Sequence, residues 1–167
     1  MSGSAKELLF DYYLEAIKNN PSRLTLLFKV AEAAIYRMDR EDKSKIMEEV
    51  TLYFDQIDGQ LLDTWKNHAQ YHLKRNYLKI LFARKTGKWQ EVKTILEGIK
   101  INELPFIKQG TLINALIELE RGRLCLYECN RLEAKKHFQI TENLIERKYG
   151  PLHPNALLVY KEILHSI

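Results

Sequence analysis

Apolar residues recur every three or four positions along most of this chain, and the clearest run lies between residues 24 and 38. It comprises Leu24, Leu27, Phe28, Ala31, Ala34, Ile35 and Met38. This spacing gathers the apolar side chains on one side of an α-helix, whereas a half-buried strand needs strict alternation. The 7 glycines and 4 prolines among 167 residues are also few for a β-rich fold, which depends on many tight turns. We therefore predict an all-α fold.

The apolar periodicity and the chain breakers between its stretches predict about eight helices. The expected ranges are 5–19, 21–38, 43–58, 61–86, 89–99, 106–128, 131–149 and 154–167. Gly59, Gly87, Pro105 and the Gly150-Pro151 pair are expected to end or separate helices. Short loops between consecutive helices predict antiparallel neighbours.

The last expected helix carries one conspicuous apolar stripe, made of Leu157, Tyr160, Leu164 and Ile167. We expect this side to be buried, and Lys161, Glu162 and His165 to face water. Burial on one side only is what the terminal helix of a helical array requires.

Residues 5–167 are predicted to form a single domain, because this length suffices for one hydrophobic core and is short for two domains with a linker. Residues 1–4 have the composition of a disordered or tag-derived end. The sequence contains no run of eighteen apolar residues and no secretory leader. Its two cysteines, Cys125 and Cys129, are too few for a disulfide framework. We expect a cytoplasmic protein with no membrane partner.

One segment of the chain is partly repeated. Residues 87–96 can be laid over residues 129–138, a displacement of 42 positions. In both copies a turn is followed by Glu, a small or β-branched apolar residue and Lys, and a bulky apolar residue stands four positions after the small one. Such internal similarity favours a repeat array over a simple bundle.

This pattern resembles the second helix of a tetratricopeptide repeat. Gly122, Ala134 and Phe138 stand where that family places two small helix-contact residues and a large apolar one. The run 146–156, with its Tyr-Gly-Pro-Leu-His-Pro turn, is similar to linkers in kinesin light chains and in the helical tail of SET-and-MYND methyltransferases. The resemblance covers about residues 61–167 and implies a right-handed α-solenoid of antiparallel helix pairs. It implies no methyl transfer, since no SET or MYND signature is present.

The repeat is longer than the family's usual period of about 34 residues. Long-helix variants also occur in the peptide-sensing domains of Rap-type bacterial regulators.

The same resemblance implies a concave wall that binds a partner. It would be lined by residues from the first helix of each pair, namely Lys74, Tyr77, Arg84, Lys85, Arg123 and Tyr127. Arg and Tyr offer large contact areas and strong hydrogen bonds, so such a wall would suit an acidic or carboxylate-bearing peptide. An ordinary solvated face with half-buried tyrosines is the alternative. The carboxylate clamp of chaperone-binding members needs Lys and Asn where this chain has Tyr77 and Leu81, so that activity is not implied.

Other chemistry has weaker signals. His68 and His72 have the spacing of a zinc-ligand pair, but Ala69 stands where a metalloprotease needs its general-base Glu. Cys125 and Cys129 are half of a structural zinc site, and we expect them to be small buried hydrophobic residues. No glycine-rich phosphate loop and no G-x-S-x-G motif occurs. We therefore predict no metal, no cofactor and no enzymatic activity.

The function predicted from sequence is a non-enzymatic adaptor or scaffold that binds another protein or a peptide in a concave helical groove. One alternative is a peptide-sensing regulatory domain of a bacterial signalling protein, dimerising through its terminal helices. Another is an RNA-binding repeat, which rests on a pI of about 8.9 and on Lys74 and Arg75 beside Tyr77. A net charge of +4 with interleaved signs does not by itself predict a nucleic-acid partner.

Overall fold

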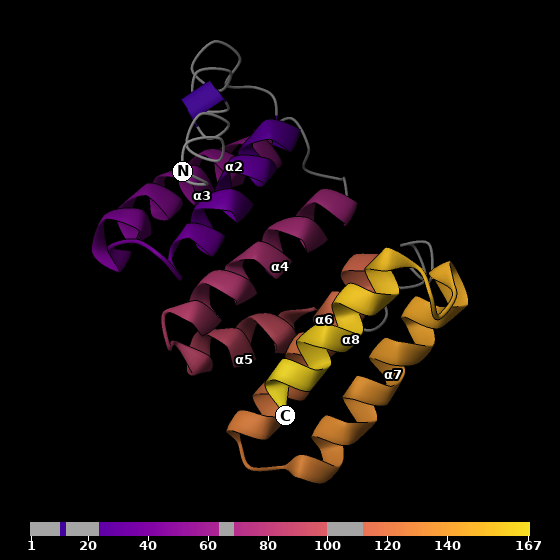
Figure 1. Ribbon diagram of the computed structural model, residues 1–167. Helices are drawn as coiled ribbons and strands as arrows, with labels where there is room; N and C mark the ends of the chain where they lie inside the picture. The colour runs from indigo at the N-terminus through magenta and orange to yellow at the C-terminus, as the bar shows by residue number, and fades with distance from the viewer. Residues whose placement is uncertain (1–10, 13–23, 64–68, 100–111) are drawn as a thin grey trace. The chain divides into compact units, whose positions relative to one another are not determined.

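In the computed structural model, the described residues are 11–12, 24–63, 69–99 and 112–167, and all structural statements concern these (Figure 1). They contain seven helices and no strand, so the all-α prediction is confirmed for them. None of these helices combines the length and the apolar character needed to cross a membrane. The chain divides into two compact units after Lys85, and each is taken by itself.

The first unit contains α2 (Leu24–Arg37), α3 (Lys43–Asp63) and α4 (Ala69–Lys85), which pack against one another. The whole apolar run predicted for residues 24–38 is buried. Leu78, Ile80 and Leu81 of α4 join the same core. Each fully buried Leu or Ile side chain contributes about 1.5–3 kcal/mol, so this burial is a main source of the stability of the packing among α2, α3 and α4.

The predicted end of the third helix before Gly59 is wrong, because α3 continues to Asp63. Glycine inside a helix costs about 0.5–1 kcal/mol relative to alanine. Ile57 and Leu61 are both buried on either side of Gly59, and their burial outweighs that cost. Gly87 does follow the end of α4, with a positive φ of 75°.

Several sequence predictions lie outside the described residues. They are the helix over 5–19 apart from residues 11 and 12, Trp65, His68, and the break at Pro105 with the start of the helix predicted over 106–128.

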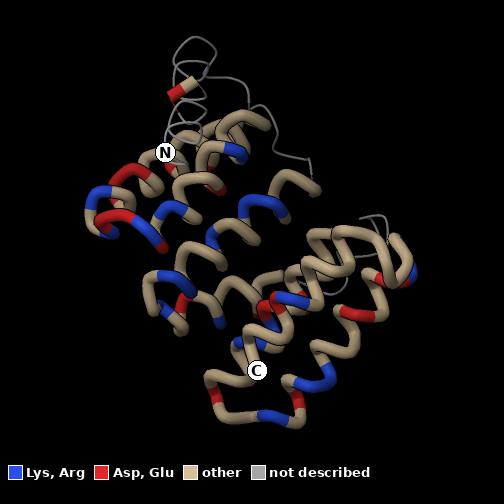
Figure 2. Tube along the Cα trace, in the orientation of Figure 1, with Lys and Arg blue, Asp and Glu red and all other residues tan. Residues whose placement is uncertain are grey.

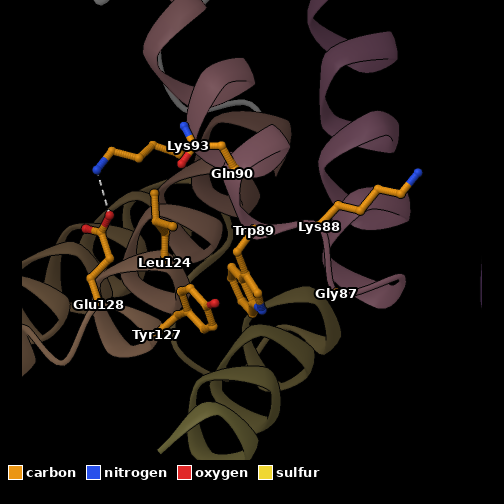
Figure 3. Close-up of a pocket in the computed structure, with 8 residues that line it drawn as sticks. All are labelled: Gly87, Lys88, Trp89, Gln90, Lys93, Leu124, Tyr127 and Glu128. Carbon is orange, nitrogen blue, oxygen red and sulfur yellow. Dashed lines mark hydrogen bonds and ion pairs between the residues drawn. The ribbon is translucent and has the colours of Figure 1, made fainter.

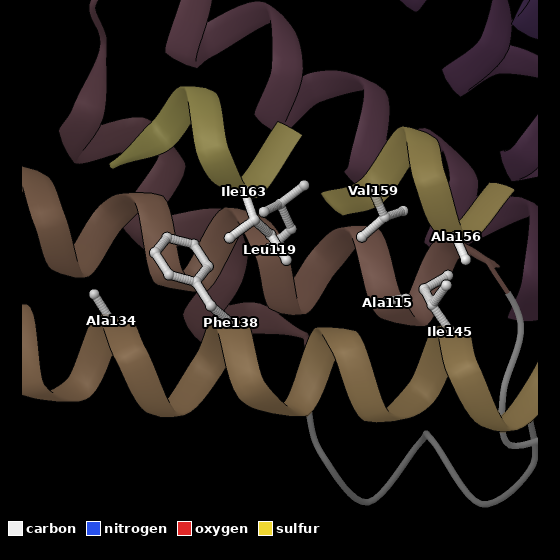
Figure 4. Close-up of a cluster of buried hydrophobic side chains, with 8 residues drawn as sticks. All are labelled: Ala115, Leu119, Ala134, Phe138, Ile145, Ala156, Val159 and Ile163. Atoms are coloured by element: carbon white, nitrogen blue, oxygen red, sulfur yellow. The ribbon is translucent and has the colours of Figure 1, made fainter. Parts of the chain in front are cut away.

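The second unit contains α5 (Trp89–Gly98), α6 (Leu112–Tyr127), α7 (Arg131–Tyr149) and α8 (Pro154–Ser166). Helix α6 packs against each of the other three. Small and large side chains from α6, α7 and α8 interlock in its core, as Figure 4 shows: Ala115, Leu119, Ala134, Phe138, Ile145, Ala156, Val159 and Ile163. Gly122 and Phe138 are in close contact, since a Cβ on Gly122 would come within 2.6 Å of Cδ1 of Phe138.

Helix α7 begins and ends as its sequence predicts. The side chain of Asn130 caps the helix by accepting a hydrogen bond from the backbone N–H of Glu133 at 3.2 Å. Gly150 ends it with a φ of 83°. Cys129 takes a left-handed φ of 62° in the turn before Asn130, so the chain reverses there within three residues.

The sequence predicted the wrong buried side for the last helix. Ala156, Val159 and Ile163 face the core of the unit. Leu157, Leu164 and Ile167 are 53%, 71% and 84% exposed. Helix α8 carries two apolar stripes, and the one with the smaller residues allows the closer approach to α6 and α7. Lys161 and His165 are exposed, as predicted.

Candidate functional site

Two aromatic side chains form an accessible stack in the second unit. Trp89 is the first residue of α5 and Tyr127 the last residue of α6. Their ring centroids lie 4.5 Å apart and their planes are inclined by 11°. Tyr127 remains 59% exposed, so its ring is accessible to a ligand.

The stack borders an open cavity of about 330 Å³ (Figure 3). This volume is at the lower end of the range of small-ligand and side-chain pockets. Its walls come from the turn before α5, the first turns of α5 and the end of α6: Gly87, Lys88, Trp89, Gln90, Lys93, Leu124, Tyr127 and Glu128. An apolar side chain of a ligand could lie on the ring faces, with polar groups around it.

Opposite charges are placed at one rim of this cavity. Lys93 Nζ lies 2.7 Å from Glu128 Oε1, as the dashed line in Figure 3 shows. The hydrogen bond to Glu128 raises the pKa of Lys93. Lys88 is exposed beside the rings, and its side chain extends away from them. A ligand carboxylate could therefore reach Lys88, while Lys93 already has a counter-ion.

Arg123 lies one turn before Tyr127 on the same face of α6. Its guanidinium contacts Glu120 Oε1 at 2.6 Å, Glu162 Oε2 at 2.6 Å and Ser166 Oγ at 2.9 Å. Burial opposes the charged form, but Glu120 and Glu162 outweigh it and raise the pKa of Arg123. The side chain is only 12% exposed, and it links α6 to α8. The structure thus places Arg123 in a contact between helices.

The sequence analysis overlooked two residues of this region. Glu120 is a carboxylate with 1% exposure, and its spacing of three from Arg123 on a helix is the signal that could have found it. The sequence places Trp89 at the start of the helix expected over 89–99 and does not mark it as a site residue. Its counterpart in the internal repeat is Arg131, so the repeat does not need an aromatic side chain there for packing.

The other four predicted site residues belong to the first unit. Tyr77 is only 5% exposed and forms part of its core. Lys74 Nζ lies 3.1 Å from Glu32 and 5.9 Å from the centre of the Tyr77 ring. Lys85 Nζ lies 2.7 Å from Asp39 and 5.2 Å from the centre of the Tyr36 ring. Arg84 is half-buried.

Helix α4 has five basic residues and no acidic one, and its charge is balanced within the first unit (Figure 2). Besides Lys74 and Lys85, Arg75 Nε lies 2.8 Å from Asp58 and Lys79 Nζ 3.9 Å from the same residue. The acidic partners come from α2, α3 and the turn between them. The Lys74, Arg75 and Tyr77 cluster that suggested RNA binding is therefore engaged in contacts within its own unit.

The two cysteines do not share one environment. Cys125 is half-buried, and burial, together with the nearby Glu128, Glu133 and Glu118, raises the pKa of its thiol. The prediction that both are buried is wrong for Cys129, which is exposed because it occupies the turn between α6 and α7. No cluster of three or more His, Cys, Asp or Glu residues suited to a metal ion occurs in the described part of the chain.

Comparison with known proteins finds no counterpart. No family model matches the chain, and no curated protein or solved structure matches it at the significance we required. The class that the structure itself defines is an all-α protein with an exposed aromatic stack in its second unit.

Proposed function

We propose that this protein is a non-enzymatic binding module, and that Trp89 and Tyr127 anchor a peptide segment of a partner protein. The observation that carries the proposal is the ring stack beside an open cavity, with Tyr127 59% exposed. Aromatic side chains of this kind dominate the energetics of protein interfaces, because a rigid ring buries much area at a small entropic cost.

The proposal includes the architecture of the array. In it, the helix pairs stack in the manner of tetratricopeptide repeats, as a right-handed solenoid. Packing within the second unit supports this. Gly122 on α6 lets Phe138 of α7 approach its backbone, and Ala134 is buried one turn before Phe138. These are the two small residues and the large one on which the resemblance rests.

An acidic peptide is the proposed ligand. The chain has a net charge of +4, and Lys88, which precedes Trp89 in the chain, is exposed. A peptide with one apolar side chain for the rings and a carboxylate for Lys88 would use both features. Lys93 contributes less in this arrangement, because Glu128 already neutralises it.

Selection from a displayed library of random peptides tests the proposal. Peptides enriched on the wild-type protein should contain an apolar or aromatic residue next to Asp or Glu. Their affinity should fall by about tenfold or more in Tyr127→Ala, which corresponds to the loss of about 1.4 kcal/mol expected for an interface anchor. Higher salt should weaken binding as well.

Leu52→Ala is the matched control, because it removes another exposed apolar side chain, from α3 of the first unit, and should not affect binding. If no peptide is enriched, or if enriched peptides bind Tyr127→Ala and the wild type equally well, the assignment is wrong.

A further inference from the structure

Helix α8 is apolar on two sides, and one of them is exposed. Its inner side packs into the core of the second unit through Ala156, Val159 and Ile163. Its outer side presents Leu157 and Leu164, which are 53% and 71% exposed. A helix that faces water on its outer side normally carries polar residues there. The outer stripe is therefore a surface suited to a further contact.

The spacing along this stripe is that of a helix-packing seam. Leu157 and Leu164 are seven positions apart, and Tyr160 lies between them on the same side of α8. Residues repeated at three, four and seven positions are the anchors that one helix offers to another. Tyr160 is half-buried and packs against the core cluster, so it lies deeper in the surface than the two leucines on either side of it.

Two carboxylates of α7 border the stripe. The hydroxyl of Tyr160 donates a hydrogen bond to Glu146. This hydrogen bond and partial burial, with smaller contributions from the charges of Glu146 and of Glu142 one turn earlier on α7, raise the pKa of Tyr160 to about 12. Among the described residues, neither carboxylate forms an ion pair with Lys or Arg. This side of the stripe therefore carries two carboxylates that a cationic partner could reach.

We propose that the stripe of Leu157, Tyr160 and Leu164, with Glu142 and Glu146 beside it, binds an amphipathic helix of a partner protein. The partner helix would place leucine-type side chains over Leu157 and Leu164, and Lys or Arg opposite the two carboxylates. Apolar contact would supply most of the affinity, and the charges would fix orientation and choice of partner.

An antiparallel pairing with a second copy of this chain fits the surface less well. A two-fold axis that pairs two α8 helices antiparallel brings identical edges together, so Glu142 and Glu146 would face the same carboxylates of the other copy. The stripe covers only one edge of a single helix. A stable dimer, in contrast, buries about 800 Å² of accessible surface on each partner. A single basic amphipathic helix meets neither difficulty.

This inference is independent of the proposal for Trp89 and Tyr127, because it rests on α7 and α8 and on different side chains. The test uses a displayed library of amphipathic helical peptides. Their apolar positions are fixed as leucine, and one flank varies among Lys, Glu and Ser. Selection on the full-length protein should enrich Lys on the flank, and the selected peptide is then labelled for anisotropy titrations.

Leu164→Ser should weaken binding of the selected peptide by about tenfold or more, as expected for loss of an anchor. Glu142→Lys combined with Glu146→Lys should reverse the preference, so that the Glu-flanked version of the peptide binds better. Ile140→Ser is the control, since Ile140 is an exposed apolar residue of α7 that is not part of the stripe. Tyr127→Ala should also leave this affinity unchanged, which separates the two proposals.

Three results would overturn the inference. One is a selection without Lys enrichment. Another is equal affinity of the wild type and Leu164→Ser for the selected peptide. The third is a wild-type protein that light scattering shows to be dimeric and that Leu164→Ser converts to a monomer, because the stripe would then be covered by a second copy.

Discussion

Gly122 is the residue at which the packing of the second unit tolerates least change. It lies within α6, where alanine would ordinarily be the better helix former. The ring of Phe138, only 6% exposed, occupies the space that a Cβ would need. Steric overlap with a buried ring therefore opposes the usual gain in helix propensity.

We expect Gly122→Ala to lower the free energy of unfolding by about 1–2 kcal/mol, because overpacking costs more than the propensity gain of about 1 kcal/mol. Urea denaturation followed by circular dichroism measures it. Gly59→Ala in α3 is the control, since a Cβ there meets nothing within 4 Å. It should raise the stability by about 0.5–1 kcal/mol. Equal stabilisation by both substitutions would show that the Gly122 contact is not tight.

Between elements, the attachment of α8 to α6 combines an apolar core with one buried ionic cluster. Arg123 bridges Glu120 on its own helix and Glu162 on α8. Glu120 is almost fully buried, and the Arg123 guanidinium beside it stabilises its charge. The cluster therefore holds the helix that carries the exposed stripe.

Replacement of Arg123 by alanine should destabilise the protein by about 1–3 kcal/mol, because it removes a charged hydrogen-bond partner of the buried Glu120 carboxylate. Urea denaturation gives the magnitude, and hydrogen exchange should show the largest loss of protection in α8. The double variant Glu120→Leu and Arg123→Leu should recover much of the loss. Lys136→Ala breaks an exposed pair with Glu133 and should change little. A small effect of Arg123→Ala would mean that the cluster is solvated.

For the whole molecule, the division after Lys85 leaves each unit with a core of its own. All members of the core cluster in Figure 4 belong to residues 115–163, and so do the caps of α7. The second unit, residues 86–167, has an interlocked core. Its size is just above the limit of about 70–80 residues below which domains usually need additional cross-links.

We expect a polypeptide of residues 86–167 to fold by itself. Circular dichroism should show a helical spectrum and a single cooperative thermal transition, because the core cluster shared by α6, α7 and α8 lies wholly within residues 115–163. Gly122→Ala should lower the transition temperature of this fragment. A fragment that is helical but melts without cooperativity would show that the core requires the rest of the chain.

Local features of the sequence were sufficient to predict most of the helices. Period-three-and-four apolar spacing found α2 and α7, and the signals at Asn130 and Gly150 marked where α7 begins and ends. These features depend on residues close in sequence, so they can be recognised before the tertiary structure is known.

Tertiary packing decided the rest. Helix α8 has two apolar stripes, and only the fit against α6 and α7 selects Ala156, Val159 and Ile163 for burial and leaves Leu157 and Leu164 outside. The basic residues of α4 were predicted to form a binding wall, but acidic residues distant in sequence balance their charge. The contact between Trp89 and Tyr127 likewise joins two helices. Periodicity tells which residues share one side of a helix, whereas the neighbour that covers that side depends on shapes and charges brought together only by folding.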